Sequence, residues 1–276
     1  MDRIQSVDRR VLYTLIFISV IIPVMWPLHL PTPETPEARA FFDAVEAIPP
    51  GSVVLFPFDF WPSTLPETEP MAVAGLRHCF RRDLKVVGLS NVGIGGPSVA
   101  DRLLDSIGAE YGKVYGVDYV NLGYKAGYQA VLLGMANSIA AIFPTDHRGT
   151  RLDSLPLMQR ALNYDSLSFV LIVSDNAMAD YWVALVNARY GLPMVAGVTA
   201  VMAPKMLSYI HTGQIKGLLG GMKGAAEYEA LLGESDMASR GMDAQSLIHL
   251  LIIGFIILGN IGYVASRRRP SPARAG

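Results

Sequence analysis

The sequence predicts an α/β protein: a doubly wound, mostly parallel sheet of the Rossmann-like kind, flanked by one transmembrane helix at each end. Three observations predict it. Through the middle of the chain, short β-branched runs alternate with helical stretches of about 10–15 residues, which is typical of βαβ units. Those runs are apolar on both faces, as strands covered by helices on two sides should be. Two long apolar segments stand near the ends of the chain.

The apolar segment 246–265 predicts the second membrane helix. Its length of roughly 20 residues, at about 1.5 Å per residue, crosses a hydrocarbon core of about 30 Å. Lipid offers the backbone no hydrogen-bond partners, so such a segment must be helical. Arg267, Arg268 and Arg269 follow it directly. The positive-inside rule therefore places the basic tail, 266–276, in the cytoplasm.

The segment 11–28 predicts the first membrane helix, as a signal anchor. The short N-terminus, 1–10, carries three arginines before the apolar run. In both membrane segments, the basic flank is thus on the side nearer to a chain terminus: it precedes the first segment and follows the second. We expect both termini in the cytoplasm and the domain between the crossings, 29–245, outside it.

Two alternatives concern these segments. The small-x-small pattern Ala38-Arg39-Ala40 leaves open a signal peptide that is cleaved. Asn260, a polar residue within the second segment, either hydrogen-bonds to another helix or reaches the lipid headgroups. The predicted location is a plasma membrane, and a short basic tail without disulfides fits a prokaryotic one.

Composition limits the partners. The formal net charge is -1, with 51% hydrophobic and 17% charged residues, so no basic face for nucleic acid is expected. Cys79 is the only cysteine, which excludes an intramolecular disulfide. We expect Cys79 to be a small buried hydrophobe, with a reactive thiol as the alternative.

The elements of the domain follow from the alternation of patterns. Seven strands are predicted, at 52–58, 85–90, 118–122, 139–143, 168–174, 193–197 and 214–219. Helices are expected from about residue 38 and at 69–82, 98–111, 126–137, 155–162, 177–190, 204–211 and 225–232. Right-handed crossovers between parallel strands then build the doubly wound sheet.

The predicted ligand site lies at the carboxyl ends of the strands, where open parallel sheets bind ligands. Polar residues gather in those loops. The predicted site residues are Asp59, Ser90, Asn91, Asp146, His147, Asp175, Asn176 and Thr199. The structural alternative for each is a helix cap, since Ser, Thr, Asp and Asn are the preferred capping residues.

Stronger chemical motifs are incomplete. The stretch Gly88-Leu-Ser90-Asn-Val92 nearly matches the nucleophile elbow of α/β-hydrolases, with Asp175 and His211 in the matching chain order. The second glycine is missing at 92, and His211 falls at a predicted helix end. The glycine-rich turn 93–98 has neither dinucleotide nor P-loop spacing, so we expect a tight turn, with an anion site as the alternative.

No metal site is predicted. Asp146 and His147, with Asp59 and Asp175, offer oxygen and imidazole ligands, but no HExxH or paired CxxC spacing supports a metal. No pattern assigns a cofactor or a catalytic residue.

Two functions from different classes remain. The first is non-enzymatic: a membrane-anchored extracytoplasmic domain that binds a ligand or partner as a subunit of a membrane complex. Its partners would be other membrane-protein subunits, the lipid bilayer and a small ligand. The alternative is a membrane-tethered hydrolase or transferase that uses Ser90 and Asp175 at the carboxyl ends of the strands. The sequence does not decide between binding protein and enzyme.

Overall fold

The structure is a computed structural model that describes residues 8–28 and 30–267. It consists of two compact units, Thr32–Ala238 and the pair Met1–Pro31 with Ser239–Gly276. Most of the predicted tail, 266–276, and most of the predicted N-terminal segment, 1–10, lie outside the described residues.

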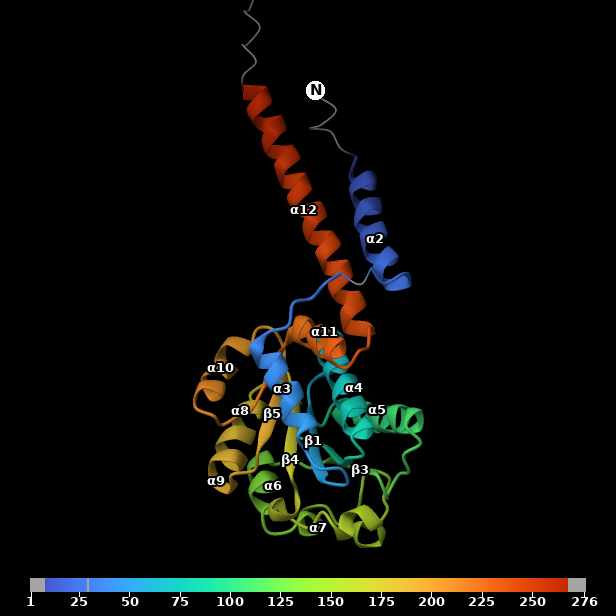
Figure 1. Cartoon of the computed structure of the whole chain (residues 1–276), viewed down its shortest axis with the longest axis vertical. Helices are drawn as coiled ribbons and strands as arrows, with labels where there is room; N and C mark the ends of the chain where they lie inside the picture. Colours follow the sequence, from blue (N-terminus) through green and yellow to red (C-terminus); the bar gives the residue numbers. More distant parts are fainter. Residues whose placement is uncertain (1–7, 29, 268–276) are drawn as a thin grey trace, which may run out of the picture. The chain divides into compact units, whose positions relative to one another are not determined.

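The unit Thr32–Ala238 is built on a six-stranded, all-parallel sheet (Figure 1). The strands are β1 (Val53–Asp59), β2 (Lys85–Ser90), β3 (Tyr119–Tyr124), β4 (Phe169–Ser174), β5 (Met194–Val198) and β6 (Leu218–Gly220). Their order is β3-β2-β1-β4-β5-β6. The chain therefore starts in the middle at β1, moves to one edge, returns to β4 and moves to the other edge. The predicted α/β, Rossmann-like class is confirmed, and the reversal of direction between β1 and β4 is its topological switch point.

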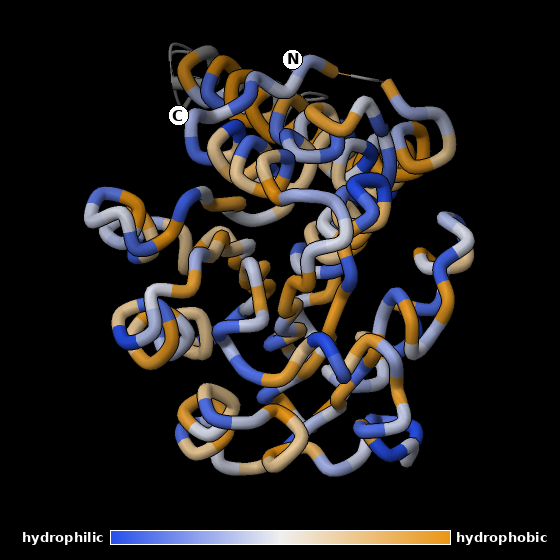
Figure 2. Tube along the Cα trace, turned by 60° about the horizontal axis from the view of Figure 1, so that its bottom comes forward, coloured by the Kyte–Doolittle hydropathy of each residue, from blue (hydrophilic) through white to orange (hydrophobic). Residues whose placement is uncertain are grey.

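Helices cover both faces of this sheet. One face carries α3 (Pro36–Glu46), α4 (Leu65–Arg81), α5 (Gly96–Glu110) and α11 (Gly221–Leu231). The other carries α6 (Tyr128–Gly134), α8 (Met178–Trp182), the π-helical turn Val183–Asn187, α9 (Ala188–Tyr190) and α10 (Ala203–His211). All residues of β1, β4 and β5 are buried, and most of them are hydrophobic, the class coloured orange in Figure 2. Such strands are buried on two sides, which explains their continuous apolar runs.

The first helix of this unit shows how local sequence sets an element. Thr35 caps α3 through its side chain, which accepts a hydrogen bond from Ala38 N, and Pro36 occupies the first turn. Ala38, Phe41 and Val45 form its buried face. Because Ala38 is fully buried in this helix, cleavage at the small-x-small pattern would require α3 to unfold first.

Close packing against the sheet requires glycine at two positions. A Cβ at Gly217 would lie 2.1 Å from the backbone nitrogen of Phe41 in α3. A Cβ at Gly88 in β2 would lie 2.8 Å from Leu104 in α5. The contact at Gly217 is with backbone atoms that cannot move aside, so α3 approaches this segment only because Gly217 lacks a side chain; at Gly88 the end of the Leu104 side chain would have to shift.

A buried polar cluster joins three helices on the same face. The His78 ring in α4 is fully buried, with Nδ1 2.6 Å from the Tyr228 hydroxyl of α11 and Nε2 2.7 Å from the Glu46 carboxylate of α3. The ring stacks on Phe42. Burial lowers the pKa of His78, and the hydrogen bond from His78 lowers the pKa of Glu46. The cluster therefore connects the first helix of the unit to its last one through α4.

The prediction of a strand at 139–143 is wrong, because this segment contains the helix α7 (Ile139–Ile142). The Ser138 side chain accepts a hydrogen bond from Ala141 N and starts the turn. The predicted helix at 155–162 is also wrong in type, since only a 3₁₀ turn, Pro156–Gln159, forms there. Further 3₁₀ turns are Pro62–Thr64, Leu152–Ser154 and Tyr164–Ser166.

The second unit contains α2 (Arg9–Met25) and most of α12 (Met237–Arg267). Among the described residues, one helix is long and apolar enough to cross a membrane, Met237–Val264. The predicted crossing at 11–28 is helical only as α2, whose 17 residues span about 26 Å, short of a core of about 30 Å. Of the two predicted membrane helices, the C-terminal one is therefore the candidate that the structure provides.

Candidate functional site

The loops that follow β1, β2 and β4 meet at the carboxyl edge of the sheet. Asp59 ends β1 and pairs in register with Ser174 of the neighbouring strand β4. Its carboxylate accepts hydrogen bonds from Asn91 N at 2.6 Å and from Trp182 Nε1 at 2.8 Å. The Asn91 side-chain amide donates to both carboxylate oxygens. Asp59 thus joins its own strand end to the loop after β2 and to α8.

The loop after β4 joins the same place. Asp175 Oδ2 accepts from Trp61 N at 2.8 Å and from the Thr64 hydroxyl at 2.6 Å. The Asn176 amide donates to the Asp59 carbonyl oxygen and to Asp175 Oδ1, each at 2.8 Å. We call Asp59, Asn91, Asp175 and Asn176 the switch-point cluster. The strand order explains why residues so distant in the chain converge, because β1 and β4 are neighbours at the switch point.

The electrostatics of the cluster centre on Asp59. Its side chain is 0% exposed. Burial raises the pKa of Asp59 to about 6, and the nearby Asp175 charge adds to the rise, while hydrogen bonds from Asn91 and Trp182 oppose it. Asn91 Oδ1 is a buried acceptor with no partner. The cluster therefore combines a buried, perturbed acid with an unused acceptor, a combination that favours a functional site.

Ser90, the nucleophile in the enzymatic alternative, is 1% exposed. Its hydroxyl is 2.6 Å from the Phe58 carbonyl oxygen, to which it donates, and it accepts from Val92 N at 3.0 Å. Within the described part of the chain, no histidine hydrogen-bonds to it. His211 lies in the exposed last turn of α10. The residues considered for a catalytic triad are therefore not linked by hydrogen bonds.

The glycine-rich turn 93–98 packs against its neighbours. A Cβ at Gly95, where φ is +83°, would lie 2.5 Å from Pro62 Cγ, and one at Gly96 would lie 2.3 Å from Ser90 Oγ. The glycines thus permit a close approach between this turn and the loop after β1. This accounts for their presence without an anion.

Asp146 and His147 lie elsewhere, beside the end of β3. Asp146 accepts from Arg148 N at 2.9 Å, Thr150 N at 2.7 Å and the Tyr115 hydroxyl at 2.7 Å, so its carboxylate holds a turn. His147 N donates to the Asn121 carbonyl oxygen at 2.8 Å. These residues line a cleft of about 360 Å³ that includes none of the switch-point cluster. The structure divides the predicted site residues between two places.

Thr199 follows β5 and is 4% exposed. Its carbonyl oxygen accepts from Met202 N and Ala203 N at the start of α10. Its hydroxyl is buried and has no partner. Thr199 therefore helps to start a helix through its backbone, and its side chain does not join the switch-point cluster by a hydrogen bond.

The structure also bears on a metal site and on a reactive thiol at Cys79. The described residues include no group of three His, Cys, Asp or Glu side chains arranged to hold a metal ion. Cys79 is 1% exposed, and burial raises the pKa of its thiol to about 12. A thiol with this pKa does not ionise near neutral pH, so the reactive-thiol alternative has no support.

No site role for Thr64 or Trp182 was predicted from the sequence. Trp182 is buried, and its indole N–H is a partner of Asp59. A buried tryptophan usually needs an acceptor. In the sequence, such an acceptor was indicated by the carboxylates in the loops that follow the strands.

Comparisons with known proteins give little further information. No protein-family model matches the chain, and no curated protein shows detectable similarity. A solved structure described as "OtsA apo structure" aligns at 12% identity with a TM-score of 0.33, over 87% of this chain and 52% of that one. The chain thus spans about half the length of that structure, and a likeness of this size carries no argument about function.

Proposed function

We propose that this protein is a membrane-anchored, extracytoplasmic α/β domain that binds a small polar ligand at the switch-point cluster. It acts as a ligand- or partner-binding subunit of a membrane complex. The observation that carries this proposal is the fully buried carboxylate of Asp59 at the switch point. Burying a carboxylate costs stability, and at this edge of a parallel sheet the cost is most readily explained by function.

The chemistry of the cluster favours binding over group transfer. Asp59 and Asp175 both accept several hydrogen bonds, and the Ser90 hydroxyl is occupied by the neighbouring backbone. The exposed Trp61 ring, 42% exposed, lies on the loop that Asp175 holds. Carboxylate and amide oxygens beside an aromatic surface suit a ligand with hydroxyl or amine donors and an apolar face.

The membrane part of the proposal rests on the smaller unit. α12 supplies one crossing, and we propose that α2 with its flanking residues supplies the second. In support, Asp243 of α12 accepts from Leu28 N at 2.8 Å and from Leu30 N at 3.1 Å. One carboxylate before the apolar part of α12 thus holds the chain just after α2. This contact fits two antiparallel crossings whose outer ends lie at the same interface.

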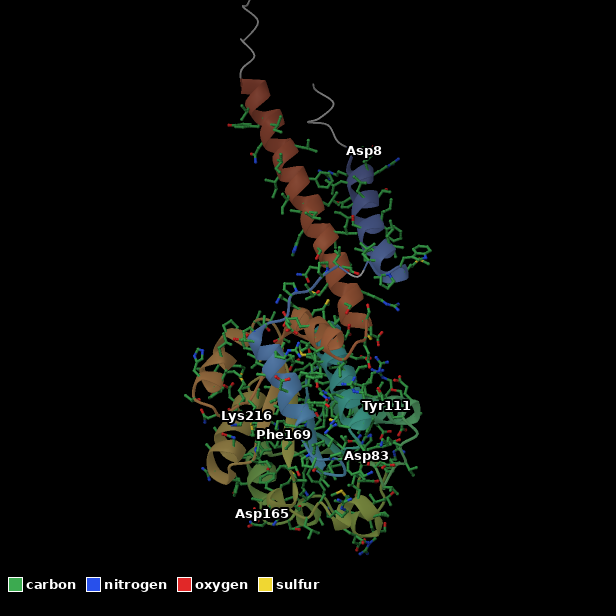
Figure 3. The ribbon with its side chains drawn as sticks, in the orientation of Figure 1. Asp8, Asp83, Tyr111, Asp165, Phe169 and Lys216 are labelled. Carbon is green, nitrogen blue, oxygen red and sulfur yellow. The ribbon has the colours of Figure 1, made fainter. Side chains whose placement is uncertain are left out.

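Native mass spectrometry of the full chain, released from mild detergent, tests the ligand. We expect a bound small molecule in the wild type that is lost from Asp175→Ala. The matched control is Asp165→Ala, an exposed residue that precedes β4 and is labelled in Figure 3. Asp165 lies before the strand rather than after it, so its loss should leave the ligand bound.

The same preparation addresses the enzymatic alternative. Hydrolysis of generic ester and phosphoester substrates that disappears in Ser90→Ala would contradict a pure binding role. Equal ligand occupancy in the wild type and Asp175→Ala would exclude the switch-point cluster as the site.

A further inference from the structure

The two edge strands of the sheet, β3 and β6, differ in how loops cover their outward backbone groups. At the β3 edge, Gly116 N donates to the Tyr119 carbonyl oxygen and His147 N donates to the Asn121 carbonyl oxygen, each at 2.8 Å. Loops therefore cover the outward backbone groups of β3. An uncovered edge strand is a template for pairing with another chain, and covering it is a common protection.

At the β6 edge, no loop makes such backbone hydrogen bonds in the described part of the chain, although the Leu218 residue as a whole is only 4% exposed. Leu218 pairs with Ala196 of β5, and Ala196 N donates to the Gly217 carbonyl oxygen. In a parallel ladder, alternate residues point their backbone groups to the same neighbour, so Leu218 and Gly220 point theirs away from β5. Among the described residues, no backbone hydrogen bond from outside the sheet reaches the Leu218 N–H or C=O or the Gly220 N–H.

A pocket lies over this open edge. Its volume is about 300 Å³, and both Leu218 and Gly220 line it. Ala203, Pro204 and Leu207 of α10 form an apolar wall on one side. Thr35, the N-cap of α3, and Lys223 of α11 belong to the polar side. Figure 1 shows the three helices, α10, α3 and α11, that supply these walls.

Charge in the pocket is unbalanced. The buried Glu227 carboxylate accepts from the Thr35 hydroxyl at 2.7 Å and forms an ion pair with Lys223. Glu37 also lines the pocket, and no ion pair to it is found among the described residues. One lysine thus faces two carboxylates, which favours an occupant with a positive side chain.

We propose that the β6 edge binds an extended peptide segment of a partner protein by strand addition. The peptide backbone pairs with Leu218 and Gly220. One of its apolar side chains enters the pocket against α10, and a lysine or arginine lies near Glu37. Backbone pairing supplies the affinity and the pocket selects side chains, as in other strand-addition complexes. This site is separate from the switch-point cluster, so failure of either proposal leaves the other standing.

An array of acetylated, amidated hexapeptides, probed with the labelled full chain in detergent, provides the test. We expect binders that combine an apolar residue with a lysine or arginine. N-methylation of the best binder, one residue at a time, should alternate in effect. Methyl groups on N–H groups that face β6 should weaken binding at least about tenfold, and those on the residues between should not, because strand pairing uses every second residue.

Protein variants complete the test. Glu37→Lys should abolish the preference for basic peptides, whereas Asp43→Lys, on the exposed side of α3, should not. Ala203→Leu should fill the pocket, since Ala203 already lies 2.9 Å from the position of a Cβ on Gly220. Ser208→Leu, exposed on the same helix, is its control.

Three results would overturn the proposal. The first is an array with no binder. The second is a binder whose affinity falls equally for N-methylation at every position, or at none. The third is a dimer in native mass spectra of the wild type that Ala203→Leu dissociates, since the edge would then be occupied by a second copy of the chain.

Discussion

Asp59 carries an unfavourable charge whose effect depends on pH. Its pKa rises from 3.8 to about 6 because the side chain is buried. The folded protein therefore holds the proton more tightly than the unfolded chain. This group consequently lowers stability as pH rises from about 4 to 6, by about 3 kcal/mol in total at 1.36 kcal/mol per unit.

Replacing Asp59 by Asn should remove that dependence. Relative to the wild type, the free energy of unfolding of Asp59→Asn should rise by about 3 kcal/mol between pH 4 and pH 7. Urea unfolding at several pH values measures this difference in the free energy of unfolding. Other groups, whose lowered pKa changes stability in the opposite direction, contribute equally to both proteins, so their contribution cancels in the comparison. Asp165→Asn should follow the wild type throughout. Parallel curves for Asp59→Asn and the wild type would contradict the assigned pKa.

The Tyr228 hydroxyl is the hydrogen-bond partner of a buried histidine, His78. Tyr228→Phe leaves His78 Nδ1 without its partner in a fully buried position. We expect a loss of about 1–3 kcal/mol in the free energy of unfolding, the usual cost of an unsatisfied buried polar group. Tyr190→Phe, at a residue 44% exposed, should change stability by less than about 0.5 kcal/mol. Similar effects of the two variants in urea unfolding would show that the cluster adds little stability.

Residue types predicted part of the switch-point cluster, and the strand order supplied the rest. Loop carboxylates and amides after strands are visible in a sequence, which is why Asp59, Asn91, Asp175 and Asn176 could be named. Asp146 and His147 have the same pattern, but their loop lies beside β3 at the edge of the sheet. Chain patterns do not contain that spatial information, because the order of parallel strands depends on the packing of distant helices.

At the scale of elements, long runs were predictable and short ones were not. Six of the predicted strands match observed ones, but the run at 139–143 became α7. A five-residue apolar run fits either a strand or a buried helical turn. Ser138 decided the outcome by capping the turn through its side chain. The run at 214–219 formed a strand only at its end, as β6.

The contact between α3 and β6 gives a prediction at this scale. In Gly217→Ala, the new Cβ would meet the backbone of Phe41 at 2.1–2.2 Å. Backbone atoms cannot rotate away, so α3 must shift, at a cost of about 1–3 kcal/mol or more. Gly75→Ala is the matched comparison, since its Cβ meets only side-chain atoms at 3.2–3.3 Å. Thermal unfolding should show the larger decrease for Gly217→Ala, and the reverse order would contradict this packing.

At the scale of the whole molecule, the proposed topology predicts labelling from one side. A membrane-impermeant maleimide applied to intact cells should label Asp165→Cys. It should label Asp8→Cys only after permeabilisation (both positions are labelled in Figure 3). The native Cys79 is buried and should not react with the maleimide, so the wild type measures the background labelling. The opposite pattern would place the α/β domain in the cytoplasm.

The His78 cluster bears on how tension would pass through the chain. α3 is the first helix after the segment that follows α2, and α11 is the last helix before α12. In the proposed topology, a pull on either membrane connection therefore reaches one of these two helices before it reaches any strand of the sheet. Since Glu46 and Tyr228 both meet His78, these two helices are joined to each other through one imidazole ring. In the proposed topology, force from the bilayer would therefore enter the α/β domain at this pair of joined helices.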